Sequence, residues 1–398
     1  MSQRSLTVTQ VGIVGGGPAG LMLSHLLAQA GIDSVVIDNR TRREIEETVR
    51  AGILERDSVR LLIESGVSDR VLTEGHKHAG IDLRFSGLSH RIDFQALIGE
   101  SVWLYPQTDV FIDLADARER DRADVRFGIS GTQVFDLTSD QPGIVFTDAT
   151  GAGQEIRCDY LIGADGSRSI CRMEVPESER RHYFREYPFA WLGILAEASP
   201  SAPELIYTHS DRGFALISQR TDVLQRMYFQ CDPEEDAADW PEDRIWSELQ
   251  ARVAGEDGFT LSEGRITDKM GLRFRSFVSE PMRYGNLLLA GDAAHTVPPT
   301  GAKGLNLALA DVSILADVLE RAVLKKDLAA LDQYSPSALA RVWKSQHFSY
   351  WMTSMLHSSP GAEPFDTRRQ IGDLESVVSS TAGSTYLAEC YTGWPKPR

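Results

Sequence analysis

The pattern of apolar and polar positions near the N-terminus predicts a strand, a helix and a second strand. Residues 6–14 alternate and then run apolar, as a buried parallel strand does. The apolar residues of segment 21–30 recur at helical spacing, and Gly31 follows where a helix C-terminus is expected. Residues 34–37 form a second apolar run that ends at Asp38. This order is that of a βαβ unit.

Further along the chain the pattern changes. Between residues 183 and 231, aromatic-rich alternating runs are separated by turns, which is typical of antiparallel strands. Residues 287–290 return to an apolar strand, and residues 305–358 follow a mainly helical pattern. Residues 359–398 have no clear period. We therefore expect a second domain with antiparallel strands in the middle of the chain and a helical region toward its end.

Composition and charge exclude several functional classes. The chain has 398 residues, with 41 Lys and Arg against 57 Asp and Glu, so its formal charge is −16. This excess of negative charge argues against nucleic-acid binding. The four cysteines lack the spacing of a disulfide framework, a zinc site or a dithiol redox centre. We therefore expect no metal site.

One uncharged segment imitates a signal peptide. Residues 11–30 contain no Asp, Glu, Lys or Arg, but five glycines and Pro18 interrupt the apolar core that a signal peptide needs. No other segment approaches the roughly 18 apolar residues of a membrane span. We therefore expect a cytoplasmic protein that does not bind membranes.

Three glycines follow the first predicted strand at the spacing of a dinucleotide-binding loop. Gly15, Gly17 and Gly20 lie between strand and helix, and Asp38 ends the second strand. In such a loop the glycines allow a tight turn, close approach of a pyrophosphate and close helix packing. The helix N-terminus offers free N–H groups to phosphates, and an acid at Asp38 can bind ribose hydroxyls. The loop indicates a dinucleotide but does not distinguish NAD from FAD.

Two later strands each end in an acidic turn. The strand within residues 158–166 ends in Asp165-Gly166, and the strand within residues 287–292 ends in Gly291-Asp292. The sequence VPPTGAKGLN follows the second turn at residues 297–306. Each acid alone is compatible with an ordinary turn. Together, the three motifs resemble those of the flavoprotein aromatic hydroxylases, in which one FAD is bound by segments far apart in sequence.

The resemblance covers nearly the whole chain and is most specific to the family members that hydroxylate 4-hydroxybenzoate. It implies an FAD-dependent monooxygenase that forms 3,4-dihydroxybenzoate with NAD(P)H and O2 through a flavin C4a-hydroperoxide. It also implies an α/β fold with a Rossmann-like FAD-binding domain over residues 1–180, completed by residues 279–320. A substrate domain with a mixed or antiparallel sheet is expected over residues 181–278, and the GD-motif strand and a helical C-terminal region over residues 279–398.

The resemblance assigns FAD contacts along the chain. The residues concerned are Gly15, Gly17, Gly20, Asp38, Arg50, Gln107, Asp165, Gly291, Asp292, Lys303, Gly304, Leu305 and Asn306. The helix that begins near residue 301 is expected to point its N-terminus at the flavin pyrimidine ring, with Lys303 close by. Both would favour an anionic reduced ring. Without the resemblance, Lys303 is equally compatible with a solvated surface lysine.

Residues 213–220 form a predicted strand that carries a hydroxyl and a guanidinium group. Side chains alternate faces along a strand, so Ser218 and Arg220 share a face. Guanidinium N–H groups match the two oxygens of a carboxylate. From the residues alone, that carboxylate could be an internal Asp or Glu or a bound acid, and the resemblance implies a bound aromatic acid. The residues expected to hold it are Tyr207, Ser218, Arg220, Tyr228 and the carbonyl of Pro299.

Three side chains are expected to move the proton of the bound phenol. By resemblance, Tyr207 and Tyr391 form a relay, and His78 passes the proton to solvent. A neutral phenol is a poor nucleophile, so removing its proton favours hydroxylation. Histidine suits the outer end because its unperturbed pKa of about 6.5 lets it exchange protons near neutrality. Taken singly, each tyrosine is compatible with an ordinary half-buried ring, and His78 with a surface residue.

The expected co-substrate is NADPH, with NADH as a competitor. No second GxGxxG occurs, so a separate nicotinamide-binding domain is not expected. By resemblance, Arg50, Arg168 and Arg275 lie near the pyridine nucleotide. Residues 39–48 depart from the family where well-known members hold the 2′-phosphate. The three arginines of this segment could bind the 2′-phosphate, whereas its three glutamates would repel it.

Alternatives remain open from the sequence. One is a flavin hydroxylase of the same fold that acts on another para-substituted benzoate or phenol. Others are a flavin-fold carrier without turnover and an NAD dehydrogenase that uses only the first βαβ unit. Large side chains in the C-terminal helical region belong either to the core or to a homodimer interface, and the family implies a homodimer. They are Trp343, Phe348, Tyr350, Trp351 and Met352.

Overall fold

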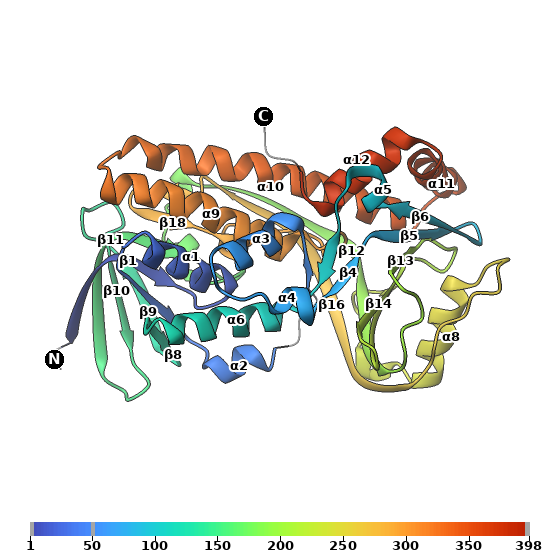
Figure 1. The fold of residues 1–398 in the computed structure, drawn as a ribbon, viewed down its shortest axis with the longest axis horizontal. Helices are drawn as coiled ribbons and strands as arrows, with labels where there is room; N and C mark the ends of the chain where they lie inside the picture. The colour runs from blue at the N-terminus through green and yellow to red at the C-terminus, as the bar shows by residue number, and fades with distance from the viewer. Residues whose placement is uncertain (1–3, 49–51, 395–398) are drawn as a thin grey trace.

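The computed structural model describes residues 4–48 and 52–394 of the chain. Figure 1 shows two parts side by side, an N-terminal sheet with its helices at the left and a second sheet at the right. The helix α10 (Ala329–Leu356) extends from the first part to the second, beside α9 (Lys303–Leu324) (Figure 1). Among the described residues, none of the helices combines the length and apolar composition that a bilayer-spanning segment needs.

The N-terminal sheet joins strands from three distant segments. Its order is β17 (Arg283–Tyr284), β18 (Leu287–Leu289), β11 (Gly153–Gly163), β1 (Ser5–Val14), β2 (Ser34–Asp38) and β8 (Asp124–Phe127). In addition, β10 (Gly143–Thr147) pairs with β11 and with β9 (Ser130–Phe135). Strands β18, β11, β1 and β2 pair in parallel, so their carboxyl ends meet at one edge. That edge brings together the ends of the three strands expected to carry the cofactor motifs.

Helices cover this sheet and build the largest core. The main ones are α1 (Pro18–Gln29) and α6 (Gln107–Arg120), together with α9 and α10. Shorter helices are α2 (Arg42–Glu46), α3 (Arg56–Glu64), α4 (Arg70–Thr73) and α7 (Ile170–Met173), and a short 3-10 turn spans Glu177–Glu179. The core contains the fully buried Val11, Ile13, Leu21 and Leu27. These positions follow the alternation and the helical spacing of the sequence, and the expected βαβ unit is confirmed.

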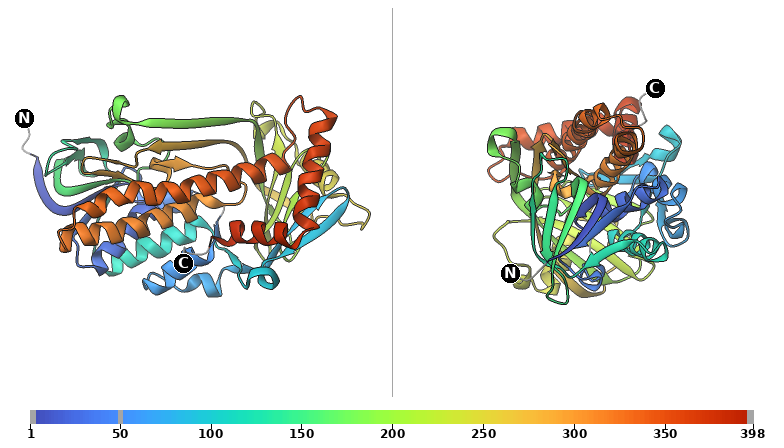
Figure 2. Two further views of the ribbon diagram at one scale, coloured as in Figure 1. Left: turned by 90° about the horizontal axis from the view of Figure 1, so that it is seen from above. Right: turned by 90° about the vertical axis from the view of Figure 1, so that its left-hand side faces the viewer.

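The second sheet is mixed. Its order is β19 (His295–Thr296), β16 (Arg265–Glu280), β12 (Arg181–Glu197), β15 (Leu224–Cys231), β14 (Ala215–Thr221), β13 (Leu205–Thr208), β5 (Gly80–Phe85) and β6 (Leu88–Asp93). Only the β13 and β5 pair is parallel among the described neighbours. The long strands β12 and β16 run from this sheet back along the first part (Figure 2). The domain boundaries remain a prediction, but pairing places β5 and β6, from the first 180 residues, in the second sheet.

Helices pack on both faces of the second sheet. One core lies between the sheet and α8 (Glu242–Val253), and a short turn (Ala237–Asp239) precedes this helix. The other core includes α5 (Phe94–Ile98), the end of α10, α11 (Pro364–Val378) and α12 (Thr381–Thr392). A small sheet of β3 (Ile53–Leu54), β7 (Val102–Leu104) and β4 (His76–His78) lies between the two parts. The expected α/β fold with a mixed sheet and C-terminal helices is confirmed, although α11 and α12 lie where the sequence showed no period.

Candidate active site

The glycine loop after β1 is shaped for close approach to a ligand. Gly15 has a φ of 112°, and a Cβ there would lie 2.1 Å from the carbonyl oxygen of Ala164. A Cβ on Gly20 would lie 1.9 Å from the carbonyl oxygen of Gly15, whereas a Cβ on Gly17 would meet nothing within 4 Å. The N-terminus of α1 has no side-chain cap and no acid in its first turn. Its N–H groups are therefore available to an anion.

Asp38 closes this loop from the end of β2. Its side chain is buried, and its Oδ2 accepts the Gly16 N–H at 2.8 Å. The other oxygen, Oδ1, accepts the backbone N–H of Arg40 at 2.9 Å, and the Arg40 guanidinium lies 3.3 Å away. A ribose at this carboxylate would share it with Arg40.

The two acidic turns meet at the same edge. A Cβ on Gly291 would lie 3.2 Å from the Cβ of Ala308 on α9 and 3.6 Å from that of Ala19 on α1. Arg172 donates to the carbonyl of Ser167 at 2.8 Å and to that of Ala293 at 2.6 Å, so it links the two turns. The three motifs that the sequence singled out therefore converge.

The carboxylate of Asp165 is used inside its own loop. It accepts the Ser169 hydroxyl at 2.5 Å and the N–H groups of Ile170 and Cys171 at 2.7 and 3.2 Å. These contacts satisfy the N-terminus of α7. A direct contact between Asp165 and FAD stays a prediction, and the contacts seen assign Asp165 to the shape of the turn.

The helix α9 presents a second uncapped N-terminus. Its N-cap Ala302 has a φ of 51°, no side chain caps the first turn, and no acid lies in it. A Cβ on Gly304 would meet nothing within 4 Å. Two uncapped helix N-termini and an open glycine cradle suit a cofactor that carries a pyrophosphate and a ring able to hold negative charge. The residues present therefore fit FAD.

Lys303 differs from the expected free cation beside the flavin. Its ammonium is buried, 2.6 Å from Glu55 Oε1 and 3.1 Å from the carbonyl of Tyr391. Arg341 lies 3.3 Å from the other oxygen of Glu55. Burial lowers the pKa of Lys303, although Glu55 opposes the shift. Glu55 therefore balances one of the two positive charges in this cluster.

Asn306 joins the same cluster from the next turn of α9. Its Oδ1 accepts the Glu55 N–H at 2.9 Å and the Ser58 hydroxyl at 2.7 Å, and its amide donates to the carbonyls of Ile53 and Ala302. The described side-chain contacts of Asn306 are therefore within the protein. They fix residues 53–58 against the start of α9, and contact with FAD stays a prediction for Leu305 and Asn306.

Strand β14 carries Ser218 and Arg220, and its pairing with β15 shifts register between Gln219 and Thr221. Phe214 and Leu216 pack in the core shared with α12, whereas Ala215 and Ile217 pack against α8 on the other face. Ser218 continues the first series, whereas Arg220 lies at the register shift, where simple alternation no longer assigns its face. The Ser218 hydroxyl donates to the carbonyl of Arg226 at 2.7 Å, so its proton is used within the sheet. Its oxygen keeps an accepting lone pair.

Arg220 is half-buried and has no carboxylate within ion-pair distance among the described residues. Burial lowers the pKa of its guanidinium, as does the neighbouring charge of Arg226, while Asp109 and Tyr228 oppose the shift. The sequence left open an internal acid as partner, and the described part of the chain offers none. An unpaired guanidinium here points to an anionic ligand.

Sequence reasoning missed Arg226. It is 7% exposed, its Nη1 has no hydrogen-bond partner among the described atoms, and its Nη2 lies 3.2 Å from the sulfur of Met270. The guanidinium lies over the ring of Tyr228, 5.4 Å from the centroid. Arg226 and Tyr228 share a face of β15, but the sequence does not show whether Arg226 has a partner. Two buried or half-buried cations, Arg220 and Arg226, therefore border the same region.

Tyr207 and Tyr391 meet as expected. Their hydroxyl oxygens lie 2.6 Å apart, and each side chain is 1% exposed. Tyr391 comes from α12 and Tyr207 from β13, so the hydrogen bond joins a C-terminal helix to the second sheet. Burial raises the pKa of Tyr207 to about 12, although Tyr391 and the N–H of Gly301 lower it. Burial also raises the pKa of Tyr391 well above its ordinary value. Both are therefore neutral at physiological pH.

His78, expected at the outer end of the proton relay, is buried. It is 1% exposed, and neither ring nitrogen has a partner among the described residues. Burial lowers its pKa to about 4, so the ring is neutral near pH 7. Its placement does not bring it into hydrogen bonding with either tyrosine. A buried imidazole with two unsatisfied nitrogens needs polar partners, and bridging water is one that a proton relay would use.

The remaining expected residues lie around this region or outside the described part. Gln107 begins α6 and is half-buried, as are Asp292 and Pro299. Arg168 and Arg275 are exposed. Arg50 lies outside the described residues.

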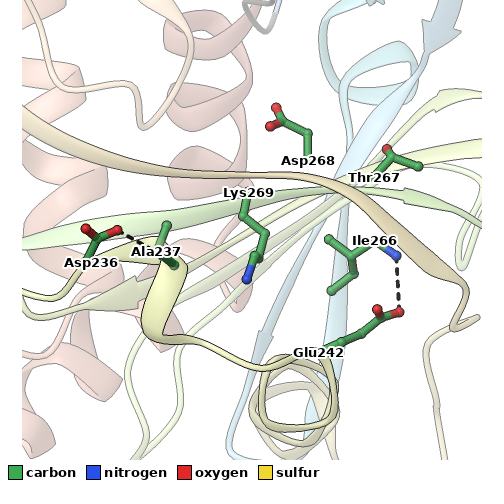
Figure 3. Close-up of a pocket in the computed structure, with 8 residues that line it drawn as sticks. Asp236, Ala237, Glu242, Ile266, Thr267, Asp268 and Lys269 are labelled. Atoms are coloured by element: carbon green, nitrogen blue, oxygen red, sulfur yellow. Dashed lines mark hydrogen bonds between the residues drawn. The ribbon is translucent and has the colours of Figure 1, made fainter.

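Two cavities lie away from these groups. One, of about 400 Å³, is lined by Asp236, Glu242 and Lys269 among others (Figure 3). Its polar groups are engaged, because Glu242 accepts the Ile266 N–H at 3.1 Å and Lys269 donates to the carbonyl of Trp240 at 2.8 Å. The other, of about 380 Å³, lies between the end of α10 and α11. Neither contains a residue of the three motifs or of the tyrosine pair.

Comparison with known proteins identifies the family of the chain. The model of the FAD binding domain family matches residues 8–349. The chain belongs to this family. It is 42% identical over 388 residues to the p-hydroxybenzoate hydroxylase of Acinetobacter baylyi, covering 97% of this chain and 96% of that protein. The chain is therefore a flavoprotein aromatic hydroxylase, and FAD is its cofactor.

Solved structures show the same fold. A p-nitrophenol 4-monooxygenase of Pseudomonas putida has a TM-score of 0.77 at 20% identity, covering 98% of this chain and all of that one. A Diels-Alderase of pyrroindomycin biosynthesis has a TM-score of 0.76 at 23% identity, covering 98% of this chain and 81% of that one. Since one of these structures is not named as a hydroxylase, the fold alone does not decide the reaction.

Proposed function

We propose that this protein hydroxylates 4-hydroxybenzoate to 3,4-dihydroxybenzoate, consuming NAD(P)H and O2. The observation that carries the proposal is the buried Tyr207–Tyr391 hydrogen bond of 2.6 Å in the same core as the strand that carries Arg220. A cation without a protein carboxylate and a pair of neutral phenols match the two ends of a 4-hydroxybenzoate molecule. The name of the relative from Acinetobacter baylyi agrees with this substrate.

The protein groups bind and orient the acid. Arg220 holds the substrate carboxylate, with Tyr228 and the Ser218 oxygen beside it, and Arg226 adds positive charge. Tyr207 and the Pro299 carbonyl face the substrate hydroxyl. When bound, FAD would carry electrons from the nicotinamide nucleotide to O2, one atom of which enters the ring. Two-ended binding fixes which ring carbon faces that oxygen.

The tyrosine pair moves a proton inside the buried site. As the substrate hydroxyl transfers its proton to Tyr207, Tyr207 gives its own proton to Tyr391, and Tyr391 gives its own toward His78. Each tyrosine oxygen therefore gains one proton as it loses one, and the substrate oxygen loses one. Because the pKa of each tyrosine is raised, neither holds a full negative charge at neutral pH. The substrate gains phenolate character, which makes its ring a better nucleophile. His78 is the proposed outer group, reached through bridging water.

The ion pairs of residues 39–48 bear on which nicotinamide nucleotide the protein uses. Arg42 pairs with Glu46 and Glu119 at 2.7 Å each and with Asp116. The other two arginines are also paired, Arg40 with Asp38 and Arg43 with Glu47. A 2′-phosphate would have to displace these carboxylates. NADPH is therefore proposed as a reductant without a strong advantage over NADH.

We propose a homodimer in the cytoplasm. Of the five large C-terminal side chains, Phe348 and Met352 are core, whereas Trp343 and Tyr350 are each 41% exposed. Tyr183 contacts Trp343 edge-on at 5.1 Å, which extends the aromatic surface onto β12. This exposed aromatic surface supports an interface between copies. The four cysteines are free, as a reducing compartment would keep them.

One assay separates the proposal from its rivals. Purified protein should be yellow, and 4-hydroxybenzoate should accelerate NADPH or NADH oxidation and yield 3,4-dihydroxybenzoate by mass spectrometry. A panel of para-substituted benzoates and phenols tests the rival hydroxylase. Bound FAD without ligand-stimulated oxidation would favour a carrier. The remaining rival, a dehydrogenase that uses only the first βαβ unit, is overturned because the family match extends to residue 349.

A further inference from the structure

The Gly291–Ala293 turn is held by side chains from three other elements. Tyr334 of α10 donates its hydroxyl to the carbonyl of Leu289 at 2.6 Å. Arg172 of α7 donates to the carbonyl of Ala293 at 2.6 Å. Asp311 of α9 accepts the Gly291 N–H on its Oδ2 at 2.9 Å. These contacts hold the backbone on both sides of Asp292, the acidic residue of the turn.

Asp311 makes a second contact with the same oxygen. His295 Nε2 lies 2.6 Å from Asp311 Oδ2, and each side chain is 2% exposed. The negative charge of Asp311 raises the pKa of His295 although burial opposes it. A buried charged pair is costly to desolvate and contributes little net stability over an apolar pair of similar volume. The main effect of these contacts is therefore on the position of the turn and not on net stability.

The position of Asp311 along α9 connects the turn to the rest of the site. The same helix begins at Lys303 with the uncapped N-terminus described above. Ala308 of this helix packs under Gly291, where a Cβ on the glycine would lie 3.2 Å away. The position of α9 therefore determines both where the Gly291–Ala293 turn lies and where the uncapped N-terminus of this helix lies.

We propose that Asp311 is a positioning residue for FAD: it fixes the Gly291 N–H and the His295 ring so that Asp292 is presented to the cofactor. The proposal rests on the assignment of Gly291 and Asp292 to the FAD site. Asp311 itself acts through the turn and does not contact the cofactor. Its role depends on where an oxygen lies and not on charge alone.

A thermodynamic cycle on FAD binding tests the proposal. Asp311→Ala should weaken FAD binding to the refolded apoprotein by about 10- to 100-fold, the range expected when a hydrogen bond to a charged group is lost. In an Asp292→Ala background, Asp311→Ala should change the affinity little further, because both act through the same residue. Fluorescence titration measures the affinity, and thermal melting of each apoprotein measures stability. Independent, additive effects, or unchanged affinity with a lower Tm, would overturn the proposal.

Two further variants apply if Asp311→Ala does not fold. Asp311→Asn keeps an oxygen that can accept both N–H groups and should retain FAD affinity within about threefold, well under the loss from one hydrogen bond. Asp311→Glu keeps the charge but moves the oxygens by one methylene, and it should bind FAD more weakly than Asp311→Asn. The reverse order would show that charge matters and would overturn the positioning role. Both readouts are of FAD binding, so they are independent of which aromatic acid is hydroxylated.

Discussion

Tyr207 and Tyr391 are separated by 184 positions, yet their phenol oxygens lie 2.6 Å apart and are closed to solvent. The ring of Phe94 stacks on Tyr391 at 5.2 Å, and Phe348 meets it edge-on at 6.2 Å. The pair is therefore held by apolar neighbours, and the hydrogen bond links the two hydroxyls directly. A proton can be exchanged along this bond without opening the site.

Replacing Tyr207 by Phe should separate flavin reduction from hydroxylation. The variant keeps Arg220 and the FAD site, so 4-hydroxybenzoate should still bind and stimulate NAD(P)H oxidation. Without the first hydroxyl of the relay, hydroxylation should slow by about 10²-fold, the lower end of what proton transfer by a side chain contributes. An oxygen electrode would follow O2 consumption, and product and peroxide assays would show H2O2 in place of 3,4-dihydroxybenzoate.

Tyr386→Phe is the matched control for this experiment. It lies on the same helix as Tyr391 and its side chain is 44% exposed. Its product yield per NAD(P)H should equal that of the unchanged protein. Full coupling in Tyr207→Phe would remove the tyrosine pair from the proposed mechanism.

The sequence predicts local elements well where packing follows a simple period. The glycine loop, the strands that lead to Asp165 and Asp292, and the alternation of β14 up to Ser218 are all read from neighbouring residues, whereas the register shift at Arg220 was not foreseen. α12 was not visible, because its sequence is rich in Thr, Ser and Gly and its helix is stabilised by packing against α11 and α5. For the same reason the enclosure of Tyr391 could not be derived from its neighbours.

Burial of charged and polar side chains is the other part that the sequence did not reveal. His78 stands beside another histidine and Lys303 stands in a glycine-rich loop, and both contexts are common on surfaces. Their burial arises from partners far along the chain, such as Glu55 for Lys303. Arg226 was missed because its significance depends on lacking a partner, and a missing partner is visible only in three dimensions.

Arg220→Ala should weaken binding of 4-hydroxybenzoate. Hydrogen bonds to a charged group contribute about 1.5–3 kcal/mol, so the Kd should rise about 10- to 100-fold. The Kd of Arg220→Lys should lie between those of the unchanged protein and Arg220→Ala. An ammonium keeps the charge but cannot bind both carboxylate oxygens in one plane. Arg212→Ala is the control, since Arg212 pairs with Glu248 and is 56% exposed. Flavin absorbance changes on titration would measure Kd, and an unchanged Kd in Arg220→Ala would exclude Arg220 from the anchor.

The ion pairs of α2 predict weak discrimination between the two nicotinamide nucleotides. The ratio of kcat/KM for NADPH over NADH should stay below about tenfold, or about 1.4 kcal/mol. Glu46→Gln combined with Asp116→Asn and Glu119→Gln should free Arg42 and shift the ratio toward NADPH. Glu197→Gln, which releases Arg265 in the second sheet, should leave the ratio unchanged. A strong NADPH preference in the unchanged protein would show that a phosphate displaces these carboxylates at little cost.

A buried histidine links α10 to the second sheet. His357 is 1% exposed, and its Nε2 accepts the indole N–H of Trp191 at 2.6 Å. Its Nδ1 then donates to the carbonyl of Thr353 at 2.9 Å. The ring stacks on Phe214 with 4.3 Å between centroids, next to the tyrosine pair. Since Nε2 must accept, this arrangement requires a neutral ring.

Acid should therefore destabilise the protein through His357. Burial lowers its pKa to about 3, whereas an unfolded histidine titrates near 6.5. Between these values the unfolded state binds a proton that the folded state does not, so the free energy of unfolding falls as pH decreases. One such group contributes about 1.4 kcal/mol per pH unit in this window. Urea unfolding from pH 7 to 4 should show this slope reduced by one proton in His357→Gln and unchanged in His347→Gln, which alters an exposed ring. Equal slopes in both variants would mean that His357 binds a proton equally in the folded and unfolded states, which would contradict the neutral, hydrogen-bonded ring.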